Sequence, residues 1–351
     1  MYTSKNKPNS RLSGKKQTGV AIITALLIVT IAATVSITIS TQLQLDIRRT
    51  GNLIALDQAE IYASFIERFT QDRLQDADDF ADLMTELRES GQFTANYPVE
   101  NGTVAGQITD LNSCLNLNSL VNSSLPPPST DALVQARLTR LLNNHDVSTA
   151  IIPAIIDWID ADSKTTSPPN GGEDGHYLNL EQPYHTANQP LSSITEVRLI
   201  KGAENAQSTP RYAPYGNILK LSEAFGENGE HGPSICAFNT DDNIPLINVN
   251  TATRAVLTSL SETMTATIAD DIIACRGKNG DEFTKIEDFT SCGNVSTIIK
   301  GADLEQLAFS SDYFLLKTQV KIGDAKKVTY SIIFRDTAGK TKIISRTQRT
   351  L

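Results

Sequence analysis

The feature that most constrains this chain is an uncharged run close to its N-terminus. Residues 20–39 carry no charged side chain, and a helix of that length, rising about 1.5 Å per residue, spans the roughly 30 Å hydrocarbon core of a bilayer. The run is longer than the apolar region of a secretory signal, and no A-x-A-like cleavage site follows it. The sequence therefore predicts one membrane-spanning helix that is retained.

A basic leader precedes this run. It holds five basic residues and no acidic residue, so the positive-inside bias keeps it in the cytoplasm and places the rest of the chain across the membrane. The net charge of the whole chain is −9, and without the five leader charges it is −14. Such an acidic body argues against nucleic acid as a partner, because phosphate binding requires positive charge.

Helical periodicity continues beyond the membrane run. Apolar residues keep recurring at helical spacing, and no proline interrupts them. We expect one helix over residues 20–78, with its membrane half at 20–40 and an amphipathic second half. Residues 72–90 are expected to stay helical until Gly91 ends them.

The N-terminal pattern resembles the type IV pilin and pseudopilin family. The resemblance rests on a basic leader that ends in Gly19, followed at once by a hydrophobic and then an amphipathic half-helix. It implies that a prepilin peptidase cuts between Gly19 and Val20, and that Val20 becomes the N-methylated first residue. It also places Thr24 at the fifth mature position, where most members of the family carry Glu.

Thr24 is the informative departure from that family. In an assembling filament the usual Glu is thought to lie beside the N-terminal amine of the subunit above it, since an unpaired charge in an apolar bundle is costly. A subunit with nothing above it has no amine to neutralise. Thr24 therefore predicts a subunit at the tip of a filament.

Strand patterns occur in two separated parts of the chain. Residues 103–121 alternate between Gly and Asn breaks, and residues 312–348 contain three alternating segments joined by turn residues. Asn250 or Thr251 is expected to cap a helix that begins at Ala252. The stretch between the strand patterns is mostly helical by period, with helices expected at 131–161, 191–201, 218–225 and 265–276.

Together these patterns predict an α+β fold. We expect a pilin-like long N-terminal helix packed on an antiparallel sheet, with a large, mostly α-helical domain inserted into the sheet. The expected division is a leader at 1–19, a pilin-like α/β domain at 79–121 and 309–351, and an inserted helical domain at 122–308, with a second helical unit at about 245–305.

Acidic residues gather in a loop rich in Gly and Pro. Asp157 and Asp160 would share one face of a helix, Asp162 follows, and Glu173 and Asp174 come directly after two glycines. Several carboxylates brought together by such a loop would repel one another unless a cation lay between them, and oxygen ligands favour Ca²⁺. The loop does not match an EF-hand, and composition leaves a solvated acidic loop equally open.

A second stretch, residues 247–289, resembles helix-hairpin-helix modules. The likeness rests on its INVNTA start and on Arg276, Gly280 and Phe283. DNA-binding members offer the backbone N–H groups of a glycine-bearing hairpin to phosphate. Here the hairpin position reads SETMTA, without glycine and among acids, so the scaffold is expected without nucleic-acid binding.

The four cysteines lack the spacing of a zinc site. Behind an export-type segment, an even number of cysteines is compatible with disulfides. Cys275 and Cys292 enclose a short loop, which favours this pair. Spacing leaves open whether Cys114 pairs with Cys236, and four buried free thiols are the alternative.

Within the pseudopilins, the chain resembles the protein K family of type II secretion systems, the large minor pseudopilins. The matching stretches are QLQLDIRRTGNLIALDQAEIYA, CLNLNSLV, IIDWIDADS with the following GGEDGHY and PYHTANQPLSSITEVRLIKG, and INVNTA. The resemblance implies a structural Ca²⁺ in the helical domain, held by Asp160, Asp162, Glu173 and Asp174, with Asp157 and Asn188 as less secure ligands.

The same resemblance implies a function in protein export. The chain would cap the periplasmic pseudopilus with the minor pseudopilins I, J and H, above the major pseudopilin, and would start its assembly. It would be a single-pass protein of the inner membrane, with its C-terminal body in the periplasm of a Gram-negative bacterium. No G-x-S-x-G or HExxH motif is present, and no enzyme activity is expected. The alternative is a membrane-anchored periplasmic protein that binds calcium or is a metal-dependent hydrolase, with Asp157, Asp160 and Asp162 as its site.

Overall fold

The computed structural model describes residues 18–122, 129–203, 232–240, 245–276 and 282–350. The chain forms two compact units that divide between Asp57 and Gln58.

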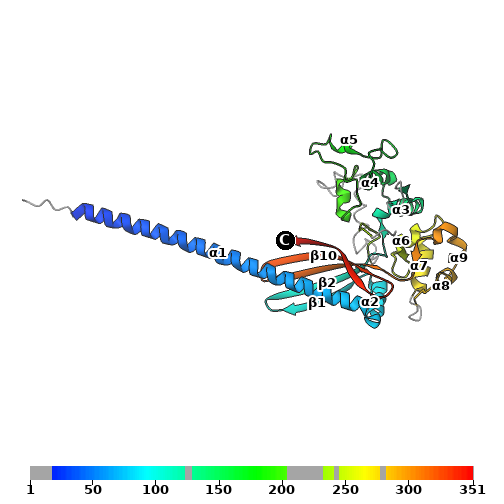
Figure 1. The fold of residues 1–351 in the computed structure, drawn as a ribbon, viewed down its shortest axis with the longest axis horizontal. Helices are drawn as coiled ribbons and strands as arrows, with labels where there is room; N and C mark the ends of the chain where they lie inside the picture. The colour runs from blue at the N-terminus through cyan, green and yellow to red at the C-terminus, as the bar shows by residue number, and fades with distance from the viewer. Residues whose placement is uncertain (1–17, 123–128, 204–231, 241–244, 277–281, 351) are drawn as a thin grey trace, which may run out of the picture. The chain divides into compact units, whose positions relative to one another are not determined.

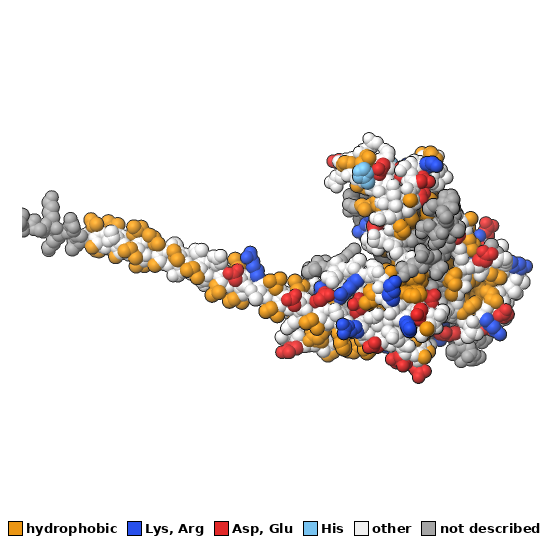
Figure 2. Space-filling model, viewed as in Figure 1, with side chains coloured by type: hydrophobic (Ala, Val, Ile, Leu, Met, Phe, Trp, Pro, Cys, Tyr) orange, Lys and Arg blue, Asp and Glu red, His pale blue; other side chains and the backbone are white. Residues whose placement is uncertain are grey.

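The long helix predicted from the sequence is confirmed. Helix α1 runs over Thr18–Gln75 without interruption, and in the first unit nearly all of its described side chains are exposed. Hydrophobic side chains cover the N-terminal part of α1 in the space-filling view (Figure 2), and the helix is long and apolar enough to cross a membrane. The Thr24 hydroxyl donates to the Val20 carbonyl at 3.1 Å and to the Ala21 carbonyl at 3.0 Å, so the helix itself satisfies this polar group.

The helix breaks where the sequence predicted that it would continue. Asp76 has extended backbone geometry, and its Oδ1 accepts hydrogen bonds from the N–H groups of Asp78 and Asp79, both at 3.0 Å. Aspartate is a favourable N-cap residue, so a second helix, α2 (Ala77–Ser90), begins there. Gly91 ends α2 as predicted, in the left-handed conformation with φ 70°.

An antiparallel sheet of five strands forms the pilin-like part of the second unit. Its order is β1-β2-β9-β10-β11, and each neighbouring pair is antiparallel. Two strands come before the inserted segment and three come after it, so the insertion lies between the adjacent strands β2 and β9, which confirms the predicted fold class (Figure 1). The strands are β1 (Phe93–Val99), β2 (Gly102–Asp110), β9 (Tyr313–Ile322), β10 (Ala325–Arg335) and β11 (Thr341–Thr350).

One face of the C-terminal part of α1 is buried against this sheet. Ala59, Ala63 and Ile66 recur on that face with almost no exposed surface. The approach is close, because a Cβ atom on Gly106 of β2 would lie 3.1 Å from the Ile66 side chain. Small residues on the helix and a glycine on the strand therefore let the two backbones come together.

In its described residues, the segment between β2 and β9 forms short helices around a large hydrophobic core, whose members range from Leu115 to Ile299 in the sequence. Its helices are α3 (Ala132–Asn144), α4 (Ile152–Ile159), α5 (Asp174–Tyr177), α6 (Arg254–Ser259), α7 (Ala266–Cys275), α8 (Ile286–Ser291) and α9 (Val295–Ile298). Among its described residues, three short two-stranded pairings occur: β3 (Leu115–Asn116) with β6 (Ile235–Cys236), β4 (Val121–Asn122) with β5 (Ser129–Thr130), and β7 (Ile247–Asn248) with β8 (Leu307–Ala308).

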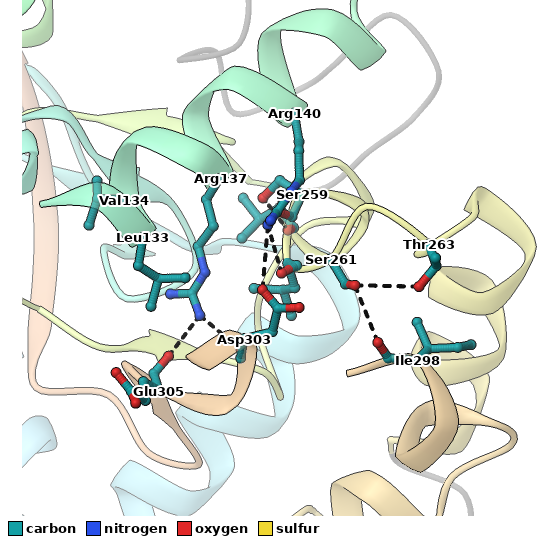
Figure 3. A network of polar contacts seen from close by, with 12 residues as sticks. Leu133, Val134, Arg137, Arg140, Ser259, Ser261, Thr263, Ile298, Asp303 and Glu305 are labelled. Carbon is teal, nitrogen blue, oxygen red and sulfur yellow. Dashed lines mark hydrogen bonds and ion pairs between the residues drawn. The ribbon is translucent and has the colours of Figure 1, made fainter. Parts of the chain in front are cut away.

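Two arginines of α3, one buried and one half-buried, donate hydrogen bonds to main-chain carbonyls of other segments around this core (Figure 3). Arg137 of α3 donates to the carbonyls of Asp303 at 2.9 Å and Glu305 at 2.7 Å. Arg140, one turn later, donates to the carbonyls of Ser259 and Leu260 at 3.1 and 2.9 Å. Burial lowers the pKa of Arg137 to about 10, which leaves it charged at neutral pH. The two side chains thus tie α3 to the end of α6 and to the segment before β9.

Several local predictions in this region need correction. The helix expected at 131–161 is divided into α3 and α4, with a one-turn 3₁₀ helix (Thr149–Ile151) before α4. The helix expected at 191–201 is a shorter 3₁₀ helix, Ile194–Leu199. The helix expected at 265–276 is present as α7, and the one expected at 218–225 lies outside the described residues.

The cap expected at Asn250 or Thr251 is at Thr253 instead. The Thr253 hydroxyl accepts from the Val256 N–H at 3.2 Å. Asn250 is buried and bonds the backbone of Phe283 in both directions, at 2.9 and 3.0 Å. Thr251 donates its hydroxyl to Asp110. Both side chains are held by residues far away in the sequence, so neither is available to cap the helix.

All four cysteines are in disulfides. Cys275 pairs with Cys292, the pair favoured by its short loop, and Cys114 pairs with Cys236, which spacing left open. The Cys114–Cys236 bond links the end of β2 to the strand β6.

Candidate metal centre

Three acidic side chains of the inserted domain come together at the ends of two helices. Asp160, Asp162 and Glu173 each offer one carboxylate oxygen, and these atoms lie within 4.8 Å of one another. Asp160 directly follows α4 and turns the chain into an extended conformation, and Glu173 is the extended residue before α5. The helix ends therefore set where the two carboxylates lie, although they are thirteen positions apart in the sequence.

Four buried side-chain oxygen atoms of the inserted domain have no hydrogen-bond partner. They are Asp157 Oδ2, Asp160 Oδ1, Glu173 Oε1 and Asn188 Oδ1. The Asp157 side chain is fully buried and Glu173 is only 7% exposed. A buried acceptor without a donor costs roughly 1–3 kcal/mol, and more when it is charged. Four such oxygens in one region match the ligand chemistry of a hard cation.

The raised pKa values of Asp157, Asp160 and Glu173 also fit a site for a cation. Burial, followed by the charges of Asp162 and Asp157, raises the pKa of Asp160 to about 6. Burial and the neighbouring aspartates raise the pKa of Glu173 to about 7. Burial also raises the pKa of Asp157. Each ionised form is disfavoured without a compensating positive charge.

The loop is built tightly around Asp157. Asp157 Oδ1 accepts a hydrogen bond from the Thr166 N–H at 2.8 Å, while its Oδ2 is the partnerless atom. A Cβ atom on Gly171 would lie 2.3 Å from that Oδ2 and 2.2 Å from the Thr166 carbonyl oxygen. Only glycine fits there, so the glycine of the acidic loop is required by close packing on a carboxylate.

Asp174 lies outside the three-residue group. Its Oδ2 is 2.9 Å from His185 Nδ1, and its Oδ1 accepts from the Thr186 N–H at 2.9 Å and from the Thr186 hydroxyl at 3.1 Å. The hydrogen bond with His185, more than any other contact, lowers the pKa of Asp174. Its role as a metal ligand stays a prediction, and both of its oxygens are engaged elsewhere in this structure.

One residue of this region had no signal in the sequence. The Lys201 ammonium donates to the carbonyls of Pro169 at 2.6 Å and Gly171 at 2.8 Å, and its backbone N–H donates to the Tyr177 hydroxyl at 3.0 Å. Lys201 lies at the end of the stretch PYHTANQPLSSITEVRLIKG, which carries the family resemblance, but nothing in that stretch predicts contacts with carbonyls about thirty residues earlier, so only the fold reveals them.

The remaining predicted site residues lie elsewhere. Gly19 and Val20 are exposed in the first turns of α1. In the helix-hairpin-helix-like stretch, Arg276 donates to the carbonyls of Val249 at 3.0 Å and Ala252 at 2.7 Å, and Gly280 lies outside the described residues. Arg276 therefore connects the end of α7 to the main chain just before α6.

The comparisons with known proteins agree over almost the whole chain. Two family models, both described as type II secretion system (T2SS) protein K, match residues 113–219 and 247–310. The type II secretion system protein K of Aeromonas hydrophila is 30% identical over 348 residues, covering 95% of this chain and 98% of that protein. The protein of the same description from Pectobacterium carotovorum subsp. carotovorum is 29% identical, covering 88% of this chain and 90% of that protein.

A solved structure has the same fold. A chain of the crystal structure of the GspK-GspI-GspJ complex from the enterotoxigenic Escherichia coli type 2 secretion system superposes with a TM-score of 0.64 and 20% identity, covering 86% of this chain and 99% of that chain. From the fold and from the length and identity of the match to the Aeromonas protein, this chain belongs to the type II secretion system protein K family.

Proposed function

We propose that this minor pseudopilin of a type II secretion system caps the tip of the periplasmic pseudopilus and starts its assembly. The fold supports an assembly role, because an apolar helix that can cross a membrane leads into a sheet domain with a large inserted helical domain. The proposed location is the inner membrane, with the body in the periplasm. No catalytic step is assigned to the chain.

The observation that carries this proposal is an apolar face on α1. Ala59, Ala63 and Ile66 face the sheet, whereas Ile61 and Phe65 are 68% and 63% exposed. These exposed residues and Tyr62, Phe69, Tyr97, Val99 and Val104 line a groove of about 450 Å³ beside β1 and β2. A helix that is apolar on two faces buries one in its own domain and leaves the other for a second helix.

The proposed occupant of the groove is the amphipathic helix of another pilin-like subunit. The similar solved structure is a complex of GspK with GspI and GspJ, so the corresponding minor pseudopilins I and J are the proposed partners, with H as a further member. The major pseudopilin would form the shaft below them.

Thr24 supports a position at the tip. Its hydroxyl bonds to carbonyls of its own helix, so it brings neither a charge nor an unsatisfied donor into an apolar bundle. A Glu at this position would need an amine from a subunit above it, because an unpaired charge is costly there. Prepilin peptidase would cut between Gly19 and Val20 and leave Val20 N-methylated, and the intact mass of the protein made beside an active peptidase tests this processing.

We further propose that the acidic loop holds a structural Ca²⁺. The partnerless oxygens and the raised pKa values fit a hard dication, which would be held by Asp160, Asp162 and Glu173, with Asp157 and Asn188 as further candidate ligands. When bound, the ion supplies positive charge that cancels carboxylate repulsion and fixes the loop. It is assigned no part in catalysis.

Co-purification with the I and J subunits tests the assembly proposal. Phe65→Glu places a charge in the apolar groove and is expected to reduce recovery of both partners at least tenfold. Leu246→Glu is the matched control, since Leu246 is an exposed leucine, 42% accessible, that does not line the groove. Equal recovery of the partners by the two variants would remove the groove from the interface.

A further inference from the structure

Lys201 contacts the chain on both sides of Glu173. On the side before Glu173, its ammonium donates to the carbonyls of Pro169 and Gly171 at 2.6 and 2.8 Å. On the side after Glu173, its backbone N–H donates to the Tyr177 hydroxyl at 3.0 Å. Hydrogen bonds from this one residue therefore lie on both sides of Glu173, the most buried residue of the three-carboxylate group.

The aliphatic stem of Lys201 also packs on the loop. A Cβ atom on Gly172 would lie 3.1 Å from both Cβ and Cδ of Lys201, and 3.2 Å from the Tyr177 hydroxyl. Lys201 itself is anchored, because the preceding Ile200 is fully buried in the core. Tyr177 is equally fixed: it is fully buried, stacks on Tyr184 at 5.3 Å between ring centroids and meets Trp158 edge-on at 5.3 Å.

We propose that Lys201 is a positioning residue for the calcium site, which holds the loop of Glu173 in a shape ready to bind the ion. This inference rests on the calcium role proposed above. Two adjacent glycines make the loop costly to order, and Lys201 supplies that order from the folded core, where two main-chain carbonyls take its donors. Residues that orient metal ligands from behind commonly change metal affinity by about 10- to 100-fold.

The direction in which Ca²⁺ affinity changes when Lys201 is replaced distinguishes a positioning role from a purely electrostatic one. A lysine near a cation site repels the cation, so removing its charge alone should strengthen Ca²⁺ binding. If Lys201 positions the loop, removing it should weaken Ca²⁺ binding against the electrostatic expectation. Lys164 is the matched control, because it lies in the same loop with an exposed side chain.

The experiment compares Ca²⁺ affinity for the wild-type protein, Lys201→Met and Lys164→Met by calorimetry. Fluorescence of Trp158, the one tryptophan in the chain, provides a second readout beside Tyr177. Lys201→Met is expected to bind Ca²⁺ about tenfold more weakly, and Lys164→Met equally or more tightly than wild type. Lys201→Arg, which keeps the charge and the donors, is expected to recover most of the affinity.

Unchanged or tighter binding by Lys201→Met would overturn the positioning role and leave the calcium role standing. Absence of Ca²⁺ binding by the wild-type protein would overturn both. If Lys201→Met does not fold in the presence of chelator, Tyr177→Phe decides, because it removes one of the three hydrogen bonds without changing any charge. It is expected to weaken binding several-fold, and wild-type affinity in that variant would refute the inference.

Discussion

Carboxylates are balanced differently in two regions of the molecule. One region is the contact between α1 and the sheet, and the other is the acidic loop of the inserted domain. On α1, Glu60 is paired with Lys327 and with Arg346, the latter at 3.0 Å, and the hydrogen bond from Lys327 leads the contacts that lower the pKa of Glu60. In the acidic loop, the pKa of Glu173 rises to about 7. The helix–sheet contact contains cations paired with its carboxylate, whereas in the described part of the chain no ion pair engages Asp160, Asp162 or Glu173.

This difference is the basis for proposing an ion in the acidic loop and not at the helix–sheet contact. A third carboxylate, Asp110 at the end of β2, is fully buried, yet it accepts hydrogen bonds from the Ser311 and Thr251 hydroxyls and from the Asn112 N–H. Burial raises the pKa of Asp110 to about 6, but each of its oxygens has a donor. Burial alone is therefore no argument for a metal site, and the proposed calcium site rests on the partnerless oxygens of the acidic loop.

Removal of calcium is expected to cause the largest change in stability, and this change should come from the acidic loop alone. At a free Ca²⁺ concentration of about 100 times Kd, binding stabilises the folded protein by about 2.7 kcal/mol, so chelator should lower the melting temperature of the purified protein in detergent. Asp162→Ala should abolish the Ca²⁺-dependent shift. Glu181→Ala, which changes an exposed acid outside the group, should keep it. A melting temperature that is indifferent to chelator would mean that the loop is merely solvated.

The pH dependence of the metal-free protein is the next largest effect. Because Glu173 and Asp160 have pKa values near 7 and 6 in the folded protein, against ordinary values of 4.5 and 3.8, the folded state binds their protons more tightly than the unfolded state. Stability in chelator should therefore rise as the pH falls from about 7.5 to 5, by on the order of 2 kcal/mol.

With saturating Ca²⁺ that trend should disappear or reverse, since protons and the ion compete for the same oxygens. Thermal unfolding at several pH values, with and without Ca²⁺, measures both curves. Parallel curves would show that these carboxylates do not share a site with the ion.

The fold was largely predictable because its main elements carry their own periodicity. The α1 helix repeats its apolar residues over many turns, and β9 and β10 alternate because one face of each strand is buried. Strand β1 was missed, since FTANYPV hardly alternates and contains Pro98. Proline is tolerated there because β1 is an edge strand, a fact that depends on the assembled sheet.

The geometry of the candidate metal centre was predictable only in part, for a related reason. Asp160, Asp162 and Glu173 stand out in the sequence as acids in a loop rich in Gly and Pro. The engagement of Asp174 by His185 and the contacts of Lys201 join residues eleven and about thirty positions apart, and no period relates them. Contacts of this kind come from the packed core, so local sequence patterns do not contain them.

The smallest expected effect concerns the helix–sheet contact. Glu60→Gln removes the acid that pairs with Lys327 and Arg346. Glu60 is partly exposed, so the loss of stability should be only about 0.5–1 kcal/mol and should shrink at high salt. Asp57→Asn, one turn earlier on α1 at an exposed position, serves as the control and should change stability by less than about 0.5 kcal/mol.

Calcium should not change the loss of unfolding free energy caused by Glu60→Gln, because the cations that pair with this carboxylate belong to the protein. Denaturant unfolding of the wild-type protein and both variants, with Ca²⁺ and with chelator, measures the stability change of each variant under each condition. A penalty that depended on Ca²⁺ would couple the two regions energetically and would contradict the view that each balances its carboxylates independently.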